Sequence, residues 1–204
     1  MKLKYVVGIL LGSTAISGTA FADGWNGMYL GVQGGYASLP STTDYFGSIY
    51  KDATLSGGLL GIDVGIDHQM SNNFVVGVLA DWSISNASGD GSIYNPGRDF
   101  TLTLHSLGKA QLRAGMSFGA ANENLLYLAG GLAFGNVERT GNVTNATNSH
   151  VGYVVSAGFE HKFSPSVSIK TEASYVDLGK KTYSGGETVR LGGLLATVGI
   201  NFHF

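Results

Sequence analysis

The stretch Phe100–Phe118 reads FTLTLHSLGKAQLRAGMSF, and its side chains alternate between two kinds. Every second residue from Phe100 onward forms one set, which contains no charged residue. The residues between them form the other set, or parity, which includes His105, Lys109 and Arg113. Successive side chains of a β-strand point to opposite faces, while a helix would scatter the two sets around its circumference. The stretch therefore predicts one long strand with an apolar and a polar face.

The same alternation recurs along the chain and predicts eight strands, at residues 30–37, 60–67, 74–82, 100–118, 125–135, 151–160, 167–175 and 194–204. The connections between them alternate in length. Short ones fall at 69–73, 119–124 and 162–166, and long ones at 38–57, 83–99, 136–149 and 178–188. A soluble sandwich gives no reason for this alternation, but an up-and-down membrane barrel does. We therefore predict an all-β fold, an eight-stranded antiparallel transmembrane β-barrel with short periplasmic turns and long extracellular loops.

Composition narrows the classes of function. Only 13% of the 204 residues are charged, against about 25% in ordinary soluble domains, and 32 are glycine. The 12 Lys and Arg residues face 14 Asp and Glu residues, which argues against nucleic acid as a partner. The chain contains no cysteine, which excludes disulfides and thiolate metal sites.

The first residues differ in kind from the rest. Lys2 and Lys4 precede an apolar run at residues 5–11, and Ala20-Phe21-Ala22 offers the small-x-small pattern that a signal peptidase requires. The run is shorter than the roughly 20 residues that cross a bilayer as a helix, so an uncleaved anchor is the weaker interpretation. We predict a cleaved secretory signal peptide at residues 1–22 and an outer-membrane barrel domain at 23–204.

Aromatic residues collect near the ends of the predicted strands, as expected for two girdles at the membrane surfaces. The loop ends carry Tyr36, Trp82, Phe100, Phe134, Tyr153 and Tyr175, and the turn ends carry Phe74, Phe118, Phe159 and Phe202. The last strand alternates and closes on an aromatic residue. Its residues Ile200, Phe202 and Phe204 predict the C-terminal signal that such barrels present to the barrel-assembly machinery.

Four segments resemble one known family. Residues 25–36, WNGMYLGVQGGY, match the WxGxYxGxxxGY opening of small outer-membrane β-barrel proteins of the porin family, the Omp25/Omp31-like surface antigens of Gram-negative bacteria. Segments 127–135, 152–160 and 170–179 resemble the fifth, sixth and seventh strands of that family. The resemblance implies a bacterial outer-membrane location. It leaves the function open, because members are described as structural proteins, narrow porins, host-contact antigens and haem binders.

An eight-stranded barrel is just wide enough to be filled by its own side chains. The inward parity places acids and bases in that space, namely Asp63, Asp67, Asp81, Lys109, Arg113, Glu160, Lys170 and Glu172. Buried charges need partners, so these residues predict a network of ion pairs that plugs the lumen. A narrow conduit for ions or small solutes is the alternative, because inward glycines leave room for water.

The sequence shows no catalytic constellation. A barrel hydrolase that acts on lipid would need a His and a Ser two residues apart on one strand, and no His-x-Ser occurs. The histidines stand singly, without the spacing of a metal site, at His68, His105, His150, His161 and His203. We predict no enzymatic activity, no cofactor and no metal. Haem binding by a rim histidine is implied by the resemblance alone.

The predicted loops are the remaining candidates for external contact. They carry apolar and aromatic side chains that a merely solubilising loop does not need, above all Leu39, Tyr45, Phe46, Tyr50 and Tyr94. These side chains either pack together as a lid over the barrel mouth or bind a host molecule. The sequence thus predicts a structural, surface-exposed protein, with a low-conductance porin and an adhesin or ligand binder as alternatives. The expected partners are outer-membrane lipids, lipopolysaccharide, the barrel-assembly machinery and an external ligand.

Overall fold

The chain folds into β-strands. The computed structural model describes residues 24–45, 48–50, 53–92, 99–141, 145–182 and 188–204. These residues form β1 (Gly27–Tyr45), β2 (Ser48–Tyr50), β3 (Thr54–Gln69), β4 (Phe74–Ser85), β5 (Ser88–Ser92), β6 (Asp99–Phe118), β7 (Asn124–Gly141), β8 (Ala146–Ser164), β9 (Val167–Thr182) and β10 (Thr188–His203). Within these ranges no helix is long and apolar enough to cross a membrane. The predicted signal peptide, Phe46 and Tyr94 lie outside the described residues.

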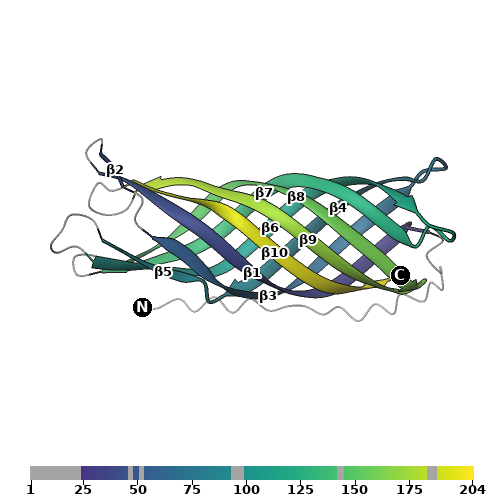
Figure 1. The fold of residues 1–204 in the computed structure, drawn as a ribbon, viewed down its shortest axis with the longest axis horizontal. Coiled ribbons are helices and arrows are strands. Elements are labelled where there is room, and N and C mark those ends of the chain that lie inside the picture. The colour runs from purple at the N-terminus through teal and green to yellow at the C-terminus, as the bar shows by residue number, and fades with distance from the viewer. Residues whose placement is uncertain (1–23, 46–47, 51–52, 93–98, 142–144, 183–187) are drawn as a thin grey trace, which may run out of the picture.

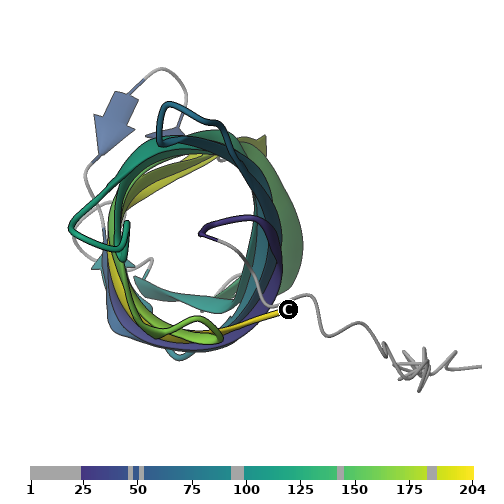
Figure 2. The ribbon, with the colours of Figure 1, turned by 90° about the vertical axis from the view of Figure 1, so that its right-hand side faces the viewer.

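The eight long strands close into a ring. They pair antiparallel in the order β1-β10-β9-β8-β7-β6-β4-β3, and a further β1–β3 ladder joins the two ends. The closure is visible at Gly31 on β1, which pairs with Asn201 on one side and with Asp63 on the other. Short β2 forms a hairpin with the end of β1, and β5 continues β4 along β6. Figure 1 shows this barrel from the side and Figure 2 along its axis. The predicted eight-stranded antiparallel barrel is confirmed.

The two ends of the barrel differ. Segments 70–73, 119–123 and 165–166 are tight connections at the end where the chain also finishes, here named the turn end (right in Figure 1). Two of these connections use positive φ angles, 65° at Asn73 and 104° at Gly119. The opposite end, here named the loop end, carries β2 and β5. The short connections therefore fall where the sequence pattern predicts them.

Large apolar side chains cover the outside of the barrel between these ends. On β3, Leu60, Ile62 and Val64 are exposed, whereas Asp63 between them is buried. Most predicted girdle residues also point outward, namely Tyr36, Trp82, Phe134, Tyr153 and Tyr175 toward the loop end and Phe118, Phe159 and Phe202 toward the turn end. This distribution is the reverse of that in a water-soluble protein and is the one expected of a barrel surrounded by lipid.

One prediction about β6 is wrong. The alternation places Phe100, Leu102 and Leu104 on the outer face, yet all three are buried inside the barrel. The ladder between β6 and β7 shifts register between Leu104 and Ser106, so His105 forms a β-bulge, and the side chains before it lie on the face opposite to the predicted one. Phe100 therefore belongs to the interior and not to the aromatic girdle.

Toward the loop end the interior becomes apolar. Buried side chains from seven of the long strands fill it, among them Leu39, Leu55, Val137 and Leu191. At the same level the outward side chains are polar: Thr42, Thr54, Thr103, His105, Glu138, Thr147, Lys180, Thr182 and Arg190. The strands thus continue into segments that the sequence pattern predicts as connections. Leu39 lies in this apolar interior and not on a loop surface.

Candidate functional site

The polar part of the lumen lies between this apolar interior and the turn end. All eight charged side chains predicted for the lumen are buried in it, and β3, β4, β6, β8 and β9 supply them: Asp63, Asp67, Asp81, Lys109, Arg113, Glu160, Lys170 and Glu172. Each occupies an inward position of its strand, because every second side chain of a strand points to the same face.

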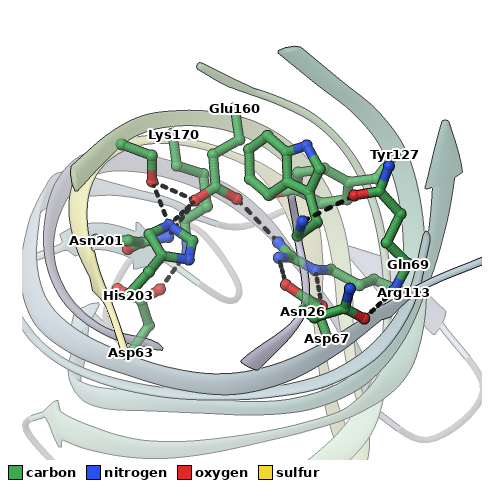
Figure 3. Close-up of polar contacts among 12 residues, drawn as sticks. Asn26, Asp63, Asp67, Gln69, Arg113, Tyr127, Glu160, Lys170, Asn201 and His203 are labelled. Carbon is green, nitrogen blue, oxygen red and sulfur yellow. Dashed lines mark hydrogen bonds and ion pairs between the residues drawn. The ribbon is translucent and has the colours of Figure 1, made fainter. Parts of the chain in front are cut away.

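Arg113 on β6 is the centre of the first cluster, drawn in Figure 3. Its Nε donates a hydrogen bond to Oδ1 of Asp67 at 2.7 Å, and its Nη2 donates to Oδ2 of the same carboxylate. Its Nη1 donates to Oε2 of Glu160 at 3.0 Å. One planar guanidinium therefore joins β6 to β3 on one side and to β8 on the other. Bidentate pairs of this kind are among the strong, geometrically specific hydrogen bonds of proteins.

Two tyrosine rings enclose the same guanidinium. The Cζ atom of Arg113 lies 4.9 Å from the ring centre of Tyr29 and 5.1 Å from that of Tyr127. Each tyrosine leans over a glycine that is its direct cross-strand partner, Gly65 for Tyr29 and Gly158 for Tyr127. The glycines thereby leave the space in which the rings lie, and the rings hold the charge by cation–π contact.

The second cluster is centred on Glu172 on β9. Lys109 donates to its Oε1 at 2.7 Å and also lies 3.4 Å from Asp81, while the Tyr127 hydroxyl donates to Oε2 at 2.8 Å. Because Tyr127 also covers Arg113, it connects the two clusters. A third ion pair, Lys170 with Asp63 at 2.5 Å, joins β9 to β3.

Neutral polar side chains complete these clusters, and the sequence analysis did not single them out. Glu160 accepts hydrogen bonds from Ser168 at 2.6 Å and from Asn201 at 2.7 Å, and His203 lies 3.5 Å from it. A separate chain of hydrogen bonds runs from Gln111 through Ser156 and Ser174 to Glu172. The sequence signal that could have found these residues is their place in the alternation, because all of them occupy inward positions of their strands.

A tryptophan closes the lumen at the turn end. Trp25 is only 1% exposed, and its indole nitrogen donates to the carbonyl of Asn122 at 2.8 Å. Lys162 stands over its ring at 4.7 Å, and His203 packs edge-on against it at 5.9 Å. Figure 2 shows the start of the described chain, in purple, bending into the opening of the ring. The sequence analysis used this residue only for the family resemblance, because a strand pattern carries no information about a segment that precedes the first strand.

The residues predicted as the C-terminal assembly signal lie on the outside. Ile200, Phe202 and Phe204 are all about half exposed, at 46%, 48% and 58%. The backbone nitrogen of Phe204 donates to the carbonyl of Met28 at 2.9 Å, which ties the end of the chain to β1. These three side chains form an apolar stripe at the turn end.

The predicted contact residues at the loop end are only partly described. Tyr45 is the last residue of β1, where it pairs with Ser48, and Tyr50 on β2 pairs with Thr43. These two tyrosines therefore belong to a β-hairpin and not to an irregular loop. Phe46 and Tyr94 lie outside the described residues, as stated above.

The polar lumen offers no conventional metal centre. Among the described residues, no group of three or more His, Cys, Asp or Glu side chains is arranged to hold a metal ion. The lumen holds instead a set of ion pairs and hydrogen bonds that join side chains from different strands.

The chain is similar to known proteins over nearly its whole length. A family model described as the outer membrane protein beta-barrel domain matches residues 8–202. The 31 kDa outer-membrane immunogenic proteins of Brucella melitensis and Brucella suis are 26% identical to the chain over 174 residues, covering 77% of this chain and 72% of the relative. The solved structure of the outer membrane protein OprG from Pseudomonas aeruginosa has a TM-score of 0.52 at 13% identity and covers 88% of this chain and 96% of that one. The last likeness concerns the fold alone.

Proposed function

The chain belongs to the outer membrane protein beta-barrel domain family, and from this premise we propose that it is a structural, surface-exposed protein with a filled lumen and no enzymatic activity. Its location is the bacterial outer membrane. In such barrels the short turns face the periplasm and the opposite end faces outward. The loop end, with β2 and the polar outer surface around it, is then the part available for external contact.

The observation that supports the proposal of a filled lumen is that its ion pairs cross the barrel. Lys109 on β6 reaches Glu172 on β9, and Lys170 on β9 reaches Asp63 on β3, so each pair passes over two intervening strands. Arg113 spans the wall in both directions, as described above. Pairs that ran along the wall would leave a channel in the middle, whereas pairs that cross it occupy that space.

Single-channel recording in a planar bilayer tests this proposal. The protein purified from outer membranes is compared with Arg113→Ala and with Arg190→Ala, whose half-exposed arginine pairs with the buried Asp177. We expect no steady conductance from the wild type and from Arg190→Ala. Arg113→Ala should open sporadically, because it removes the side chain that joins three strands.

A steady wild-type conductance that changes in Arg113→Ala would contradict the plug. It would assign the protein to the alternative class, a low-conductance porin for ions or small solutes. A steady conductance unaffected by Arg113→Ala would place the conducting path elsewhere and would contradict both interpretations of the lumen.

We also propose lipopolysaccharide as a partner at the outer surface. Arg190 and Lys180 are direct cross-strand partners on β10 and β9, and both are exposed on the outward face just beyond Tyr175 of the girdle. Two cations at the height of the lipid headgroups suit phosphate groups. Exchange of both for Gln should weaken the binding of purified lipopolysaccharide and leave the barrel folded.

The stripe of Ile200, Phe202 and Phe204 supports the role of an assembly signal. An apolar, outward edge at the end of the last strand is accessible before the barrel closes against β1. We expect Phe204→Ala to slow assembly in cells while the purified variant, once folded, unfolds at the wild-type urea concentration. Equal assembly rates would contradict the role.

External contact through the β1–β2 hairpin is tested separately. Tyr45→Ala and Tyr50→Ala should reduce attachment of the protein to host cells if the hairpin binds an external ligand. Unchanged attachment would leave the structural role of the barrel as the proposed function.

A further inference from the structure

Three strands bring two acceptor groups together at one glycine. Gly31 on β1 is the direct partner of Asp63 on β3 and of Asn201 on β10. All three positions face the lumen, and the side chains of Asp63 and Asn201 are almost fully buried, at 1% and 0% exposure. A carboxylate and an amide therefore meet over a residue that has no side chain of its own.

The orientation of both groups is determined by their other contacts. Lys170 holds Oδ2 of Asp63 at 2.5 Å. The amide nitrogen of Asn201 donates to Glu160 at 2.7 Å, so its oxygen must point the other way. Neither Oδ1 of Asp63 nor Oδ1 of Asn201 accepts a hydrogen bond from any of the described residues.

These two oxygens converge on the same small space. A Cβ atom built on Gly31 would lie 2.5 Å from Oδ1 of Asp63 and 2.1 Å from Oδ1 of Asn201. Both atoms are acceptors only, so they cannot satisfy each other. An acceptor buried without a donor or a cation is costly, and a buried charge is more so.

The charge of the polar lumen adds a second argument. The described side chains there include five carboxylates, Asp63, Asp67, Asp81, Glu160 and Glu172, and four basic groups, Lys109, Arg113, Lys170 and His203, the last of them 3.5 Å from Glu160. Lys162 at the turn end is engaged with the Trp25 ring and with the carbonyl of Gly24. The lumen thus holds more negative than positive charge, which favours a cation over a neutral molecule.

We propose that Oδ1 of Asp63 and Oδ1 of Asn201 bind a small monovalent cation, such as Na⁺, inside the barrel next to Gly31. Carboxylate and carbonyl oxygens are the ligands of hard cations. A single charge suits the site because one carboxylate oxygen faces it, while the other is held by Lys170. The Tyr29 hydroxyl on β1, which has no hydrogen-bond partner among the described residues, lies over Gly65, the next inward position of β3 after Asp63.

Urea unfolding of the protein purified from outer membranes tests the site. We expect the unfolding midpoint to rise with NaCl concentration and to rise less in N-methylglucamine chloride of equal ionic strength. Gly31→Ala places a methyl group against both oxygens, which blocks their approach to a cation, and should abolish the difference between the salts. Gly34→Ala is the matched control on the same strand, because its Cβ would meet nothing closer than 3.7 Å.

A direct measurement does not depend on the folding of any variant. Wild-type crystals soaked in a thallous salt should show anomalous scattering between the two oxygens. Equal midpoints in the two salts, or crystals without that anomalous peak, would overturn the proposal and leave water as the donor. A rise caused by CaCl₂ or MgCl₂ but not by NaCl would overturn the monovalent assignment. The proposal concerns the binding of an ion between two side chains of the lumen and not the flow of ions through it. Conductance of the barrel would therefore neither support nor contradict the site.

Discussion

The ring of Tyr127 occupies the space that a side chain at Gly158 would need. The two residues are direct partners across β7 and β8, and a Cβ at position 158 would lie 2.2 Å from Cζ and 2.3 Å from the hydroxyl oxygen of the tyrosine. We expect Gly158→Ala to displace the ring from Arg113 and Glu172 and to lower the free energy of unfolding by about 1–3 kcal/mol, the usual cost of overpacking. Urea titration followed by gel mobility measures this change.

The control for this variant is Gly130→Ala on β7. Its Cβ would meet only the carbonyl oxygen of Val154, at 3.7 Å, which is an ordinary contact. Its midpoint should stay within error of the wild type. Equal effects of the two substitutions would mean that strand propensity, and not the ring over Gly158, determines the loss.

Removal of the central arginine should destabilise the barrel strongly. Arg113→Ala leaves the carboxylates of Asp67 and Glu160 buried without the cation that both contact, and breaking a buried pair in this way costs about 3–5 kcal/mol. Arg190→Ala should cost much less, because its side chain is 52% exposed. Equilibrium unfolding in detergent micelles compares the two, and a larger loss in Arg190→Ala would contradict the importance of the lumen network.

The two tryptophans of the chain should respond differently to lipid. Trp25 is buried in the turn end of the lumen, whereas Trp82 is 53% exposed on the outer surface. In vesicles of brominated lipid, the variant that retains only Trp82, Trp25→Phe, should lose most of its fluorescence. The variant that retains only Trp25, Trp82→Phe, should keep it. Strong quenching of Trp25 would mean that the N-terminal segment lies against the bilayer and not inside the ring.

Acid should affect the 119–123 turn through Glu123. Hydrogen bonds from its own backbone N–H and from that of Ala121 hold the pKa of Glu123 below its ordinary value of 4.5. A lowered pKa in the folded state means that this stabilisation is complete above pH 4.5 and is lost as the pH falls through the lowered pKa. Carboxyl-detected NMR titration should give a midpoint below 4.5, and a midpoint at or above that value would contradict these hydrogen bonds.

Much of this fold is predictable from the period of two alone. The alternation locates the strands, separates the lipid face from the lumen and identifies the eight charged residues of the polar lumen, because all three follow from side chains pointing to alternate faces. It did not identify Arg139 and Asp177, which are buried as well. It fails at His105, since one extra residue in a bulge inverts every assignment beyond it. The spacing of three between Leu104 and Leu107, both buried, is the only local trace of that bulge.

The partners within the lumen are harder to predict. That Arg113 contacts Asp67 and Glu160, and not Asp63 or Glu172, depends on which positions lie at the same height, and height depends on strand tilt and register. The role of Tyr29 and Tyr127 is visible only once each is known to face a glycine across the ladder. Trp25 depends on where a short segment before β1 turns, which no periodicity encodes.

The apolar interior at the loop end has a further consequence. There the barrel wall has an apolar inside and a polar outside, as in water-soluble proteins, although the same strands continue into the membrane span. Outward positions such as Thr147 and Thr182 are exposed in this section, so substitutions at them leave the apolar interior unchanged. This section of the barrel can therefore change its outer surface on the strands themselves while the packing of its interior stays the same.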